Sequence, residues 1–126
     1  MRTVVVKSVD VAAVRRALDA YVARLFTTRA DVEEVVVFGS FAHGSYAPGS
    51  DLDLLVVLRE ADGPVRDRIP SLLPREFPVG LDIFPYTQAE LAERPDSPVV
   101  EDAAASRWRY RRPGPAPLHT QPAAAN

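Results

Sequence analysis

The sequence predicts an α/β domain, in the α+β sense, built on a small mixed β-sheet with helices packed mainly on one face. Three observations support this class. Three short apolar runs have strand composition, and the segments between them have the composition of helices or turns. A segment with helical periodicity precedes the first run. The chain has 126 residues, 47% of them hydrophobic, which is enough for one domain with a continuous core.

The first expected element is an amphipathic helix over residues 9–28. Apolar side chains recur there every three or four residues, and Ser8 or Asp10 is the candidate N-cap. The residues expected to face the core are Val11, Val14, Leu18, Tyr21, Val22 and Leu25. The Val-rich residues 31–38 then predict the first strand.

The middle of the chain predicts a second strand between two irregular segments. We expect a short helical turn at residues 41–46, a turn at 47–50 and a buried strand at 51–59. Residues 62–73 have a helical pattern that Pro70 interrupts, because proline lacks an N–H and clashes with the preceding turn.

The last third of the chain predicts one more strand and two helices. The strand is expected at residues 79–84. Thr87 and Glu90 have the spacing of a capping box, which predicts a short helix. A further helix is expected from Ser97 to about Tyr110. Its buried side is expected to consist of Val99, Val100, Ala103, Ala104 and Trp108.

Composition limits the class of protein. We expect one domain over residues 1–112 and a disordered Pro/Ala-rich tail over 113–126, which has too little apolar content to pack. The net charge of -2 offers no general attraction to nucleic acid or to membranes, so neither is expected as a partner. The absence of cysteine excludes disulfides and thiolate chemistry. No apolar run of membrane-spanning length or signal-peptide pattern is present, and we expect a cytoplasmic location.

The most informative motif lies between the first two predicted strands. Gly39 and Ser40 follow the first strand, and Asp51 and Asp53 begin the second. Alternate residues of a strand point to the same face, so the two carboxylates lie side by side. Two neighbouring carboxylates repel each other unless a cation lies between them, and Mg²⁺ is commonly held by one or two carboxylates plus substrate phosphates. Gly39 allows a tight turn and close approach of a phosphate.

This pattern resembles the DNA polymerase β-like nucleotidyltransferase superfamily, whose mark is Gly-Ser followed, after ten residues, by Asp-x-Asp. The small size and the segment Val79 to Thr87 are similar to the minimal nucleotidyltransferase (MNT) branch. In that branch a third acidic residue lies on a later strand, and Asp82 is the matching position. The resemblance covers roughly residues 8–110.

The resemblance implies a metal-dependent enzyme that transfers a nucleoside monophosphate, AMP from ATP by default, to an acceptor hydroxyl. It implies two Mg²⁺ ions, with Asp51, Asp53 and Asp82 as catalytic metal ligands. Asp82 would serve the acceptor side and help to take up the proton of the attacking hydroxyl. Gly39 and Ser40 would bind the β- and γ-phosphates, and Ser50 is a further candidate in the same loop.

One position departs from the family pattern. Family members often carry an Arg where this chain has His43. An Arg is a permanent cation facing phosphate, whereas a histidine is not. For His43 we favour a surface or rim position over the role of a catalytic base. For Asp82 the alternative to a metal ligand is a single outward-facing charge. The cluster Arg107, Arg109, Arg111 and Arg112 fits either a solvated helix end or contact with RNA or an acidic partner.

The acceptor is the open question. The MNT resemblance implies a helical partner of the HEPN type, against which such proteins act as antitoxins, in some cases by adenylylating a tyrosine of the toxin. A surface formed by Val99, Val100 and Trp108 is the candidate contact. One alternative is a small-molecule transferase of the aminoglycoside-modifying kind, completed by homo-oligomerisation. The other is a non-catalytic module that binds the toxin.

Overall fold

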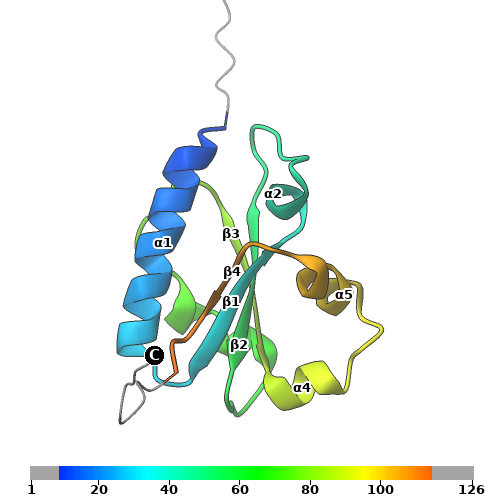
Figure 1. Cartoon of the computed structure of the whole chain (residues 1–126). Helices are drawn as coiled ribbons and strands as arrows, with labels where there is room; N and C mark the ends of the chain where they lie inside the picture. The colour runs from blue at the N-terminus through cyan, green and yellow to red at the C-terminus, as the bar shows by residue number, and fades with distance from the viewer. Residues whose placement is uncertain (1–8, 115–126) are drawn as a thin grey trace, which may run out of the picture.

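The computed structural model describes residues 9–114, which form a four-stranded mixed sheet between two unequal layers of helices (Figure 1). The strands are β1 (Val32–Phe38), β2 (Leu52–Leu58), β3 (Leu81–Thr87) and β4 (Arg109–Arg111), in the spatial order β3-β2-β1-β4. β1 pairs antiparallel with β2 and with β4, while β2 and β3 are parallel. The predicted mixed α/β class is confirmed.

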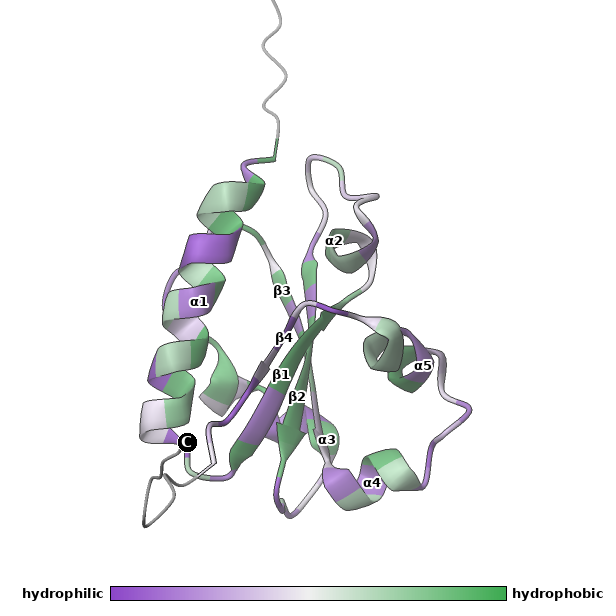
Figure 2. Ribbon diagram, viewed as in Figure 1, coloured by the Kyte–Doolittle hydropathy of each residue, from purple (hydrophilic) through white to green (hydrophobic). Residues whose placement is uncertain are grey.

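Helix α1 (Val11–Thr28) covers one face of the sheet. Asp10 is its N-cap, and Asp10 Oδ1 accepts a hydrogen bond of 3.0 Å from the Ala13 N–H. The apolar residues at helical spacing pack with alternate residues of the strands into the first core cluster. Its buried members are Val14, Leu18, Tyr21, Val22, Leu25, Val32, Val35, Val37, Phe41, Leu52, Leu54, Val56, Leu58, Leu72 and Ile83. Figure 2 shows the apolar centre of the sheet that this cluster occupies.

The parallel pairing of β2 with β3 needs a crossover, because the chain must return to the same end of the sheet. The crossover contains α3 (Val65–Arg68) and the 3₁₀ turn η1 (Pro70–Leu72), so the helical segment is interrupted at proline as predicted. Leu72 is buried in the first core cluster, and its carbonyl accepts a 2.7 Å hydrogen bond from Tyr21 Oη. The crossover and α1 therefore share one face.

Two shorter helices cover the opposite face, α4 (Gln88–Ala92) and α5 (Pro98–Ala105) (Figure 1). The predicted capping box is present: Glu90 N–H donates to Thr87 Oγ1, and Thr87 N–H donates to Glu90 Oε1. The second core cluster on this face has as its buried members Val36, Phe38, Leu55, Val57 and Ala103. The larger core lies under α1, and this second layer is small.

The helix expected from Ser97 to about Tyr110 was predicted too long. It ends at Ala105, and residues Arg109–Arg111 form the edge strand β4. Residues 109–111 pair antiparallel with residues 34–36 of β1, and the Glu34 carboxylate accepts from Arg109 Nη1 at 3.1 Å and from Arg111 Nε at 3.0 Å. Arg109 also donates to the Ala103 carbonyl at 2.6 Å, which satisfies a terminal carbonyl of α5.

The early end of α5 also divides the buried side that was predicted for it. Ala103 is buried and Val99 packs against the second core cluster, whereas Trp108 packs against the first, on the other side of the sheet. Val99, Val100 and Trp108 therefore do not form one continuous surface.

The predicted tail lies almost entirely outside the described residues, since only Pro113 and Gly114 of it fall within them, in neither helix nor strand. Within residues 9–114, no helix is both long enough and apolar enough to cross a membrane.

Candidate active site

The candidate site begins where β1 ends, at Gly39. Its backbone has φ +74° and ψ -152°, a region that essentially only glycine occupies. A Cβ atom at this position would also overlap Asp53 Oδ2. The short helix α2 (Ser40–His43) follows directly and packs Phe41 into the first core cluster. Gly39 is therefore required both by the turn and by the carboxylate beside it.

Asp53 is the centre of the site. It pairs with Phe38 on β1 and with Asp82 on β3, so the two carboxylates occupy neighbouring positions on adjacent strands. Leu52 and Leu54, which flank Asp53, are fully buried in the first core cluster. By the alternation of a strand, Asp53 and Asp82 lie on the face that carries α5. Strand alternation, which predicted that Asp51 and Asp53 share a face, therefore places them opposite the buried Leu52 and Leu54.

A second glycine accommodates Asp51. A Cβ atom on Gly80 would overlap Asp51 Oδ1, and the Gly80 carbonyl accepts a 2.8 Å hydrogen bond from the Leu52 N–H. The start of β3 thus lies directly against the start of β2. In the sequence, Gly80 was indicated only as part of the segment Val79 to Thr87. Its role in the site depends on the parallel register of β2 and β3, which no local pattern indicated.

The carboxylates around Asp53 affect it electrostatically. The pKa of Asp53 is raised above its ordinary value, first by burial and then by the negative charges of Asp82, Asp51 and Asp102. Asp51 and Asp82 are exposed, and Asp53 is half-buried. A carboxylate that is partly desolvated among like charges favours a cation beside it.

The donor set fits Mg²⁺ in the form in which proteins usually hold it. Among residues 9–114, no three acidic or histidine side chains converge on one point at metal-ligand distance. Mg²⁺ commonly takes only one or two protein carboxylates and completes its octahedron with phosphate and water oxygens. Asp53 with Asp51 or Asp82 provides oxygen donors of this kind.

Asp102 is the site residue that the sequence analysis missed. It projects from α5, and its Oδ2 accepts a 2.7 Å hydrogen bond from the Gly39 N–H. Its Oδ1 lies 2.6 Å from His43 Nε2, within hydrogen-bond distance. Asp102 and Gly39 are 63 positions apart in the chain, and no motif or spacing relates them.

The other predicted residues have distinct surroundings. His43 is on the rim, with 59% of its side chain exposed. Ser50 Oγ accepts a 2.8 Å hydrogen bond from the Ala47 N–H and closes the turn before β2. Ser40 is the first residue of α2 and half-buried, and its carbonyl accepts from the Ser45 N–H at 3.0 Å. The structure brings Gly39, Asp51 and Asp53 together, with Asp82 on the next strand.

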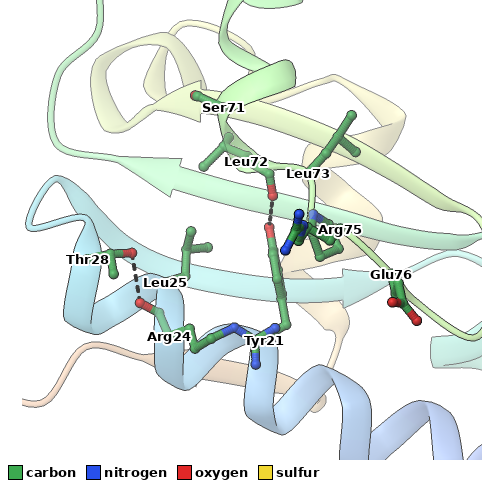
Figure 3. A pocket seen from close by; sticks show the side chains of 10 residues that line it. Tyr21, Arg24, Leu25, Thr28, Ser71, Leu72, Leu73, Arg75 and Glu76 are labelled. Carbon is green, nitrogen blue, oxygen red and sulfur yellow. Dashed lines mark hydrogen bonds between the residues drawn. The ribbon is translucent and has the colours of Figure 1, made fainter.

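A separate cavity lies on the α1 face of the sheet. A cavity of about 470 Å³ separates the C-terminal half of α1 from residues 71–76, with Tyr21 and Leu72 in its wall (Figure 3). Both of these residues belong to the first core cluster, on the face opposite to Asp53 and Asp82. The cavity is therefore not part of the carboxylate site.

Two comparisons with known proteins gave a match. The family model described as "Nucleotidyltransferase domain" matches residues 18–101, more than half of the chain. A crystal structure from Sulfolobus solfataricus, of a protein provisionally named as a nucleotidyltransferase, is similar with a TM-score of 0.51 and 24% identity, over 66% of this chain and 78% of that chain. At this identity the likeness shows the fold alone. No curated protein matches. The chain belongs to the nucleotidyltransferase domain family.

Proposed function

We propose that this protein transfers a nucleoside monophosphate, AMP from ATP, to an acceptor hydroxyl with the help of Mg²⁺. The observation that carries the proposal is Asp53, half-buried beside Gly39 and flanked by Asp51 and Asp82. A cluster of like charges at a glycine turn suits a metal-bound triphosphate, because the metal supplies the counter-charge to the carboxylates and the phosphates complete the ligands of the metal.

Each residue has a defined task in this proposal. Asp51 and Asp53 would hold two Mg²⁺ ions, which would neutralise charge on the leaving pyrophosphate. Backbone N–H groups at Gly39 and Ser40 bind the β- and γ-phosphates, and Ser50 keeps the loop closed.

Asp82 serves the acceptor. It is exposed on the edge strand β3, where an acceptor can approach. As the acceptor oxygen forms its bond to the α-phosphorus, the bond between that phosphorus and the bridging oxygen breaks. Pyrophosphate leaves with the electron pair, and Asp82 accepts the hydroxyl proton. Positioning of the acceptor supplies much of the rate in such a transfer.

For the acceptor, we propose a tyrosine of a helical HEPN-type protein, so that the chain acts as an antitoxin. The support is the MNT resemblance of Gly39-Ser40, Asp51, Asp53 and Asp82. Asp82 is exposed on the edge strand β3, which offers an approach for a protein acceptor. Intact mass of both proteins after co-expression with a HEPN-type partner and ATP is the test. Addition of AMP to the partner supports the antitoxin role, while transfer only to small molecules contradicts it.

The metal site is tested by thermal stability. A ligand that binds only the folded state stabilises it by mass action, so Mg²⁺ with ATP is expected to raise the melting temperature by several degrees at about 100 times Kd. Asp51→Asn with Asp53→Asn should abolish the Mg²⁺-dependent part of the shift. Asp62→Asn with Asp96→Asn, which removes two exposed carboxylates outside the site, is the matched control. Retention of the full shift by the first double variant would refute the site.

A further inference from the structure

We propose that Asp102 is an internal anion that occupies the position of a substrate phosphate at the Gly39 turn, so that the nucleotide must displace it to bind. The inference rests on the proposed function and adds a regulation of the same site. It makes α5 an autoinhibitory element whose hold on the turn opposes nucleotide binding.

The contacts of Asp102 are those that a phosphate would make. Its two oxygens engage two separate groups of the turn, the Gly39 N–H at 2.7 Å and His43 Nε2 at 2.6 Å. Hydrogen bonds to a charged acceptor are short and stronger than neutral ones, and backbone N–H groups accept phosphate oxygens in the same way. The Gly39 N–H cannot donate at full strength to the Asp102 carboxylate and to a substrate phosphate at the same time.

Asp102 also lies in the field of the carboxylate cluster, since its charge is among those that raise the pKa of Asp53. A metal-bound triphosphate at Asp53 and a carboxylate at Gly39 would therefore meet at one place. The like charges of the triphosphate and Asp102 repel each other, which makes joint occupancy unfavourable.

The packing of α5 on the sheet is weak enough to permit its release from the Gly39 turn. Ala103 is the one buried residue of α5. A cavity of about 160 Å³ lies between α5 and the sheet, lined in part by Val100 and Ala103 of the helix and by Val36, Leu55 and Val57 of the strands. Together with the packing of Val99, the contact of Asp102 with the turn therefore helps to hold α5 on the sheet, while Arg109 holds its C-terminal end.

The test is the affinity for Mg²⁺ with a non-hydrolysable ATP analogue, measured by calorimetry. Asp102→Ala should tighten binding about tenfold, because two charge-assisted hydrogen bonds no longer compete with the ligand. Asp102→Asn keeps an acceptor oxygen but loses the charge, and it should give a smaller gain. This variant also serves if Asp102→Ala folds poorly. Glu101→Ala, the exposed neighbour on α5, is the matched control and should change the affinity little.

Two further measurements separate displacement from a general charge effect. Asp102→Ala should increase the affinity for inorganic tripolyphosphate with Mg²⁺ as much as it does for the ATP analogue, because Asp102 competes with phosphate and not with the base. The gain in affinity should persist at 0.5 M salt. At this concentration, salt screens the interaction between exposed charges that are more than roughly 4 Å apart.

The outcomes are distinct. Suppose that the wild type binds the nucleotide. If Asp102→Ala then binds it equally or more weakly, or if the gain in affinity of this variant vanishes at high salt, the autoinhibitory role of Asp102 is wrong and the proposed function stands. If neither the wild type nor any variant binds nucleotide with Mg²⁺, both the proposed function and the autoinhibitory role of Asp102 are wrong.

Discussion

At the residue scale, Gly39 meets two independent demands. Its backbone lies at φ +74°, and the space that a Cβ would fill holds Asp53 Oδ2. Gly44 has a similar φ of +77°, but nothing lies near the place of its Cβ. The two glycines therefore share the backbone requirement and differ in the contact with the site.

We expect Gly39→Ala to reduce the free energy of unfolding by roughly 2–4 kcal/mol, from a strained backbone and a displaced carboxylate. Gly44→Ala should cost only about 1 kcal/mol, for the left-handed backbone alone. Urea unfolding measures both. Gly39→Ala should also lose the Mg²⁺-ATP shift in melting temperature, and equal behaviour of the two variants would contradict the role given to Asp53.

Asp82 supports a separate prediction, because the proposed function gives its strand neighbour Asp53 a role in metal binding and gives Asp82 a role at the acceptor. Asp82→Asn should lower the transfer rate by about 100-fold to 10,000-fold, as loss of a general base does, and leave the affinity for Mg²⁺-ATP largely intact. Single-turnover transfer and calorimetry separate the two effects. Near-normal turnover would identify Asp82 as a surface carboxylate only.

At the scale of elements, the junction of β3 and α4 depends on one ion pair. Arg68, whose side chain is only 8% exposed, lies with Nη1 2.7 Å from Glu90 Oε1. The same carboxylate completes the capping box of α4. The Arg68 guanidinium, followed by the Thr87 N–H, lowers the pKa of Glu90 to about 2. One carboxylate thus connects the crossover with α4.

This pKa determines a pH dependence. Because the folded state lowers the pKa of Glu90 from 4.5 to about 2, the ionised carboxylate stabilises the fold above the unfolded pKa. That stabilisation is lost as the pH falls from about 4.5 towards 2. Glu90→Gln keeps the capping box without the charge, so its stability should fall less steeply over this range. Unfolding free energies at pH 2–7 measure this, and parallel curves would contradict the assignment.

At the scale of the whole molecule, the C-terminal strand closes the domain. Arg112, next to β4, donates to three carbonyls at the α1–β1 junction, Val32 at 2.7 Å, Phe26 at 3.1 Å and Arg29 at 2.6 Å. Arg111 makes one exposed pair with Glu34. Three of the four clustered arginines, those at 109, 111 and 112, therefore have partners within the protein.

We expect Arg112→Gln to lower stability by roughly 1–3 kcal/mol, since three carbonyls lose a charged donor. Arg111→Gln should cost less than about 1 kcal/mol, as exposed ion pairs do.

Truncation after Arg112 should leave the melting temperature unchanged, because the Pro/Ala-rich residues 113–126 have little apolar content to bury. Equal losses from both substitutions, or a drop of several degrees on truncation, would contradict this boundary.

The sequence by itself determined what depends on neighbours along the chain. Helical spacing predicted α1 and its buried side, and strand alternation placed Asp51 and Asp53 opposite Leu52 and Leu54. Capping chemistry predicted the start of α4. These features follow from the periodicity of the backbone, which repeats within a few residues.

The tertiary structure alone decided what depends on pairing between distant segments. The alternation of arginine with Trp108 and Tyr110 is itself a strand pattern that the helix prediction overlooked, and the structure adds its partner, because residues 109–111 pair antiparallel with β1. Gly80 reaches Asp51 through the parallel register of β2 and β3, and Asp102 reaches Gly39 because α5 packs on the second face of the sheet. Such contacts are set by the packing of a few apolar residues on each face, and the local pattern of a chain does not specify which distant segment will supply them.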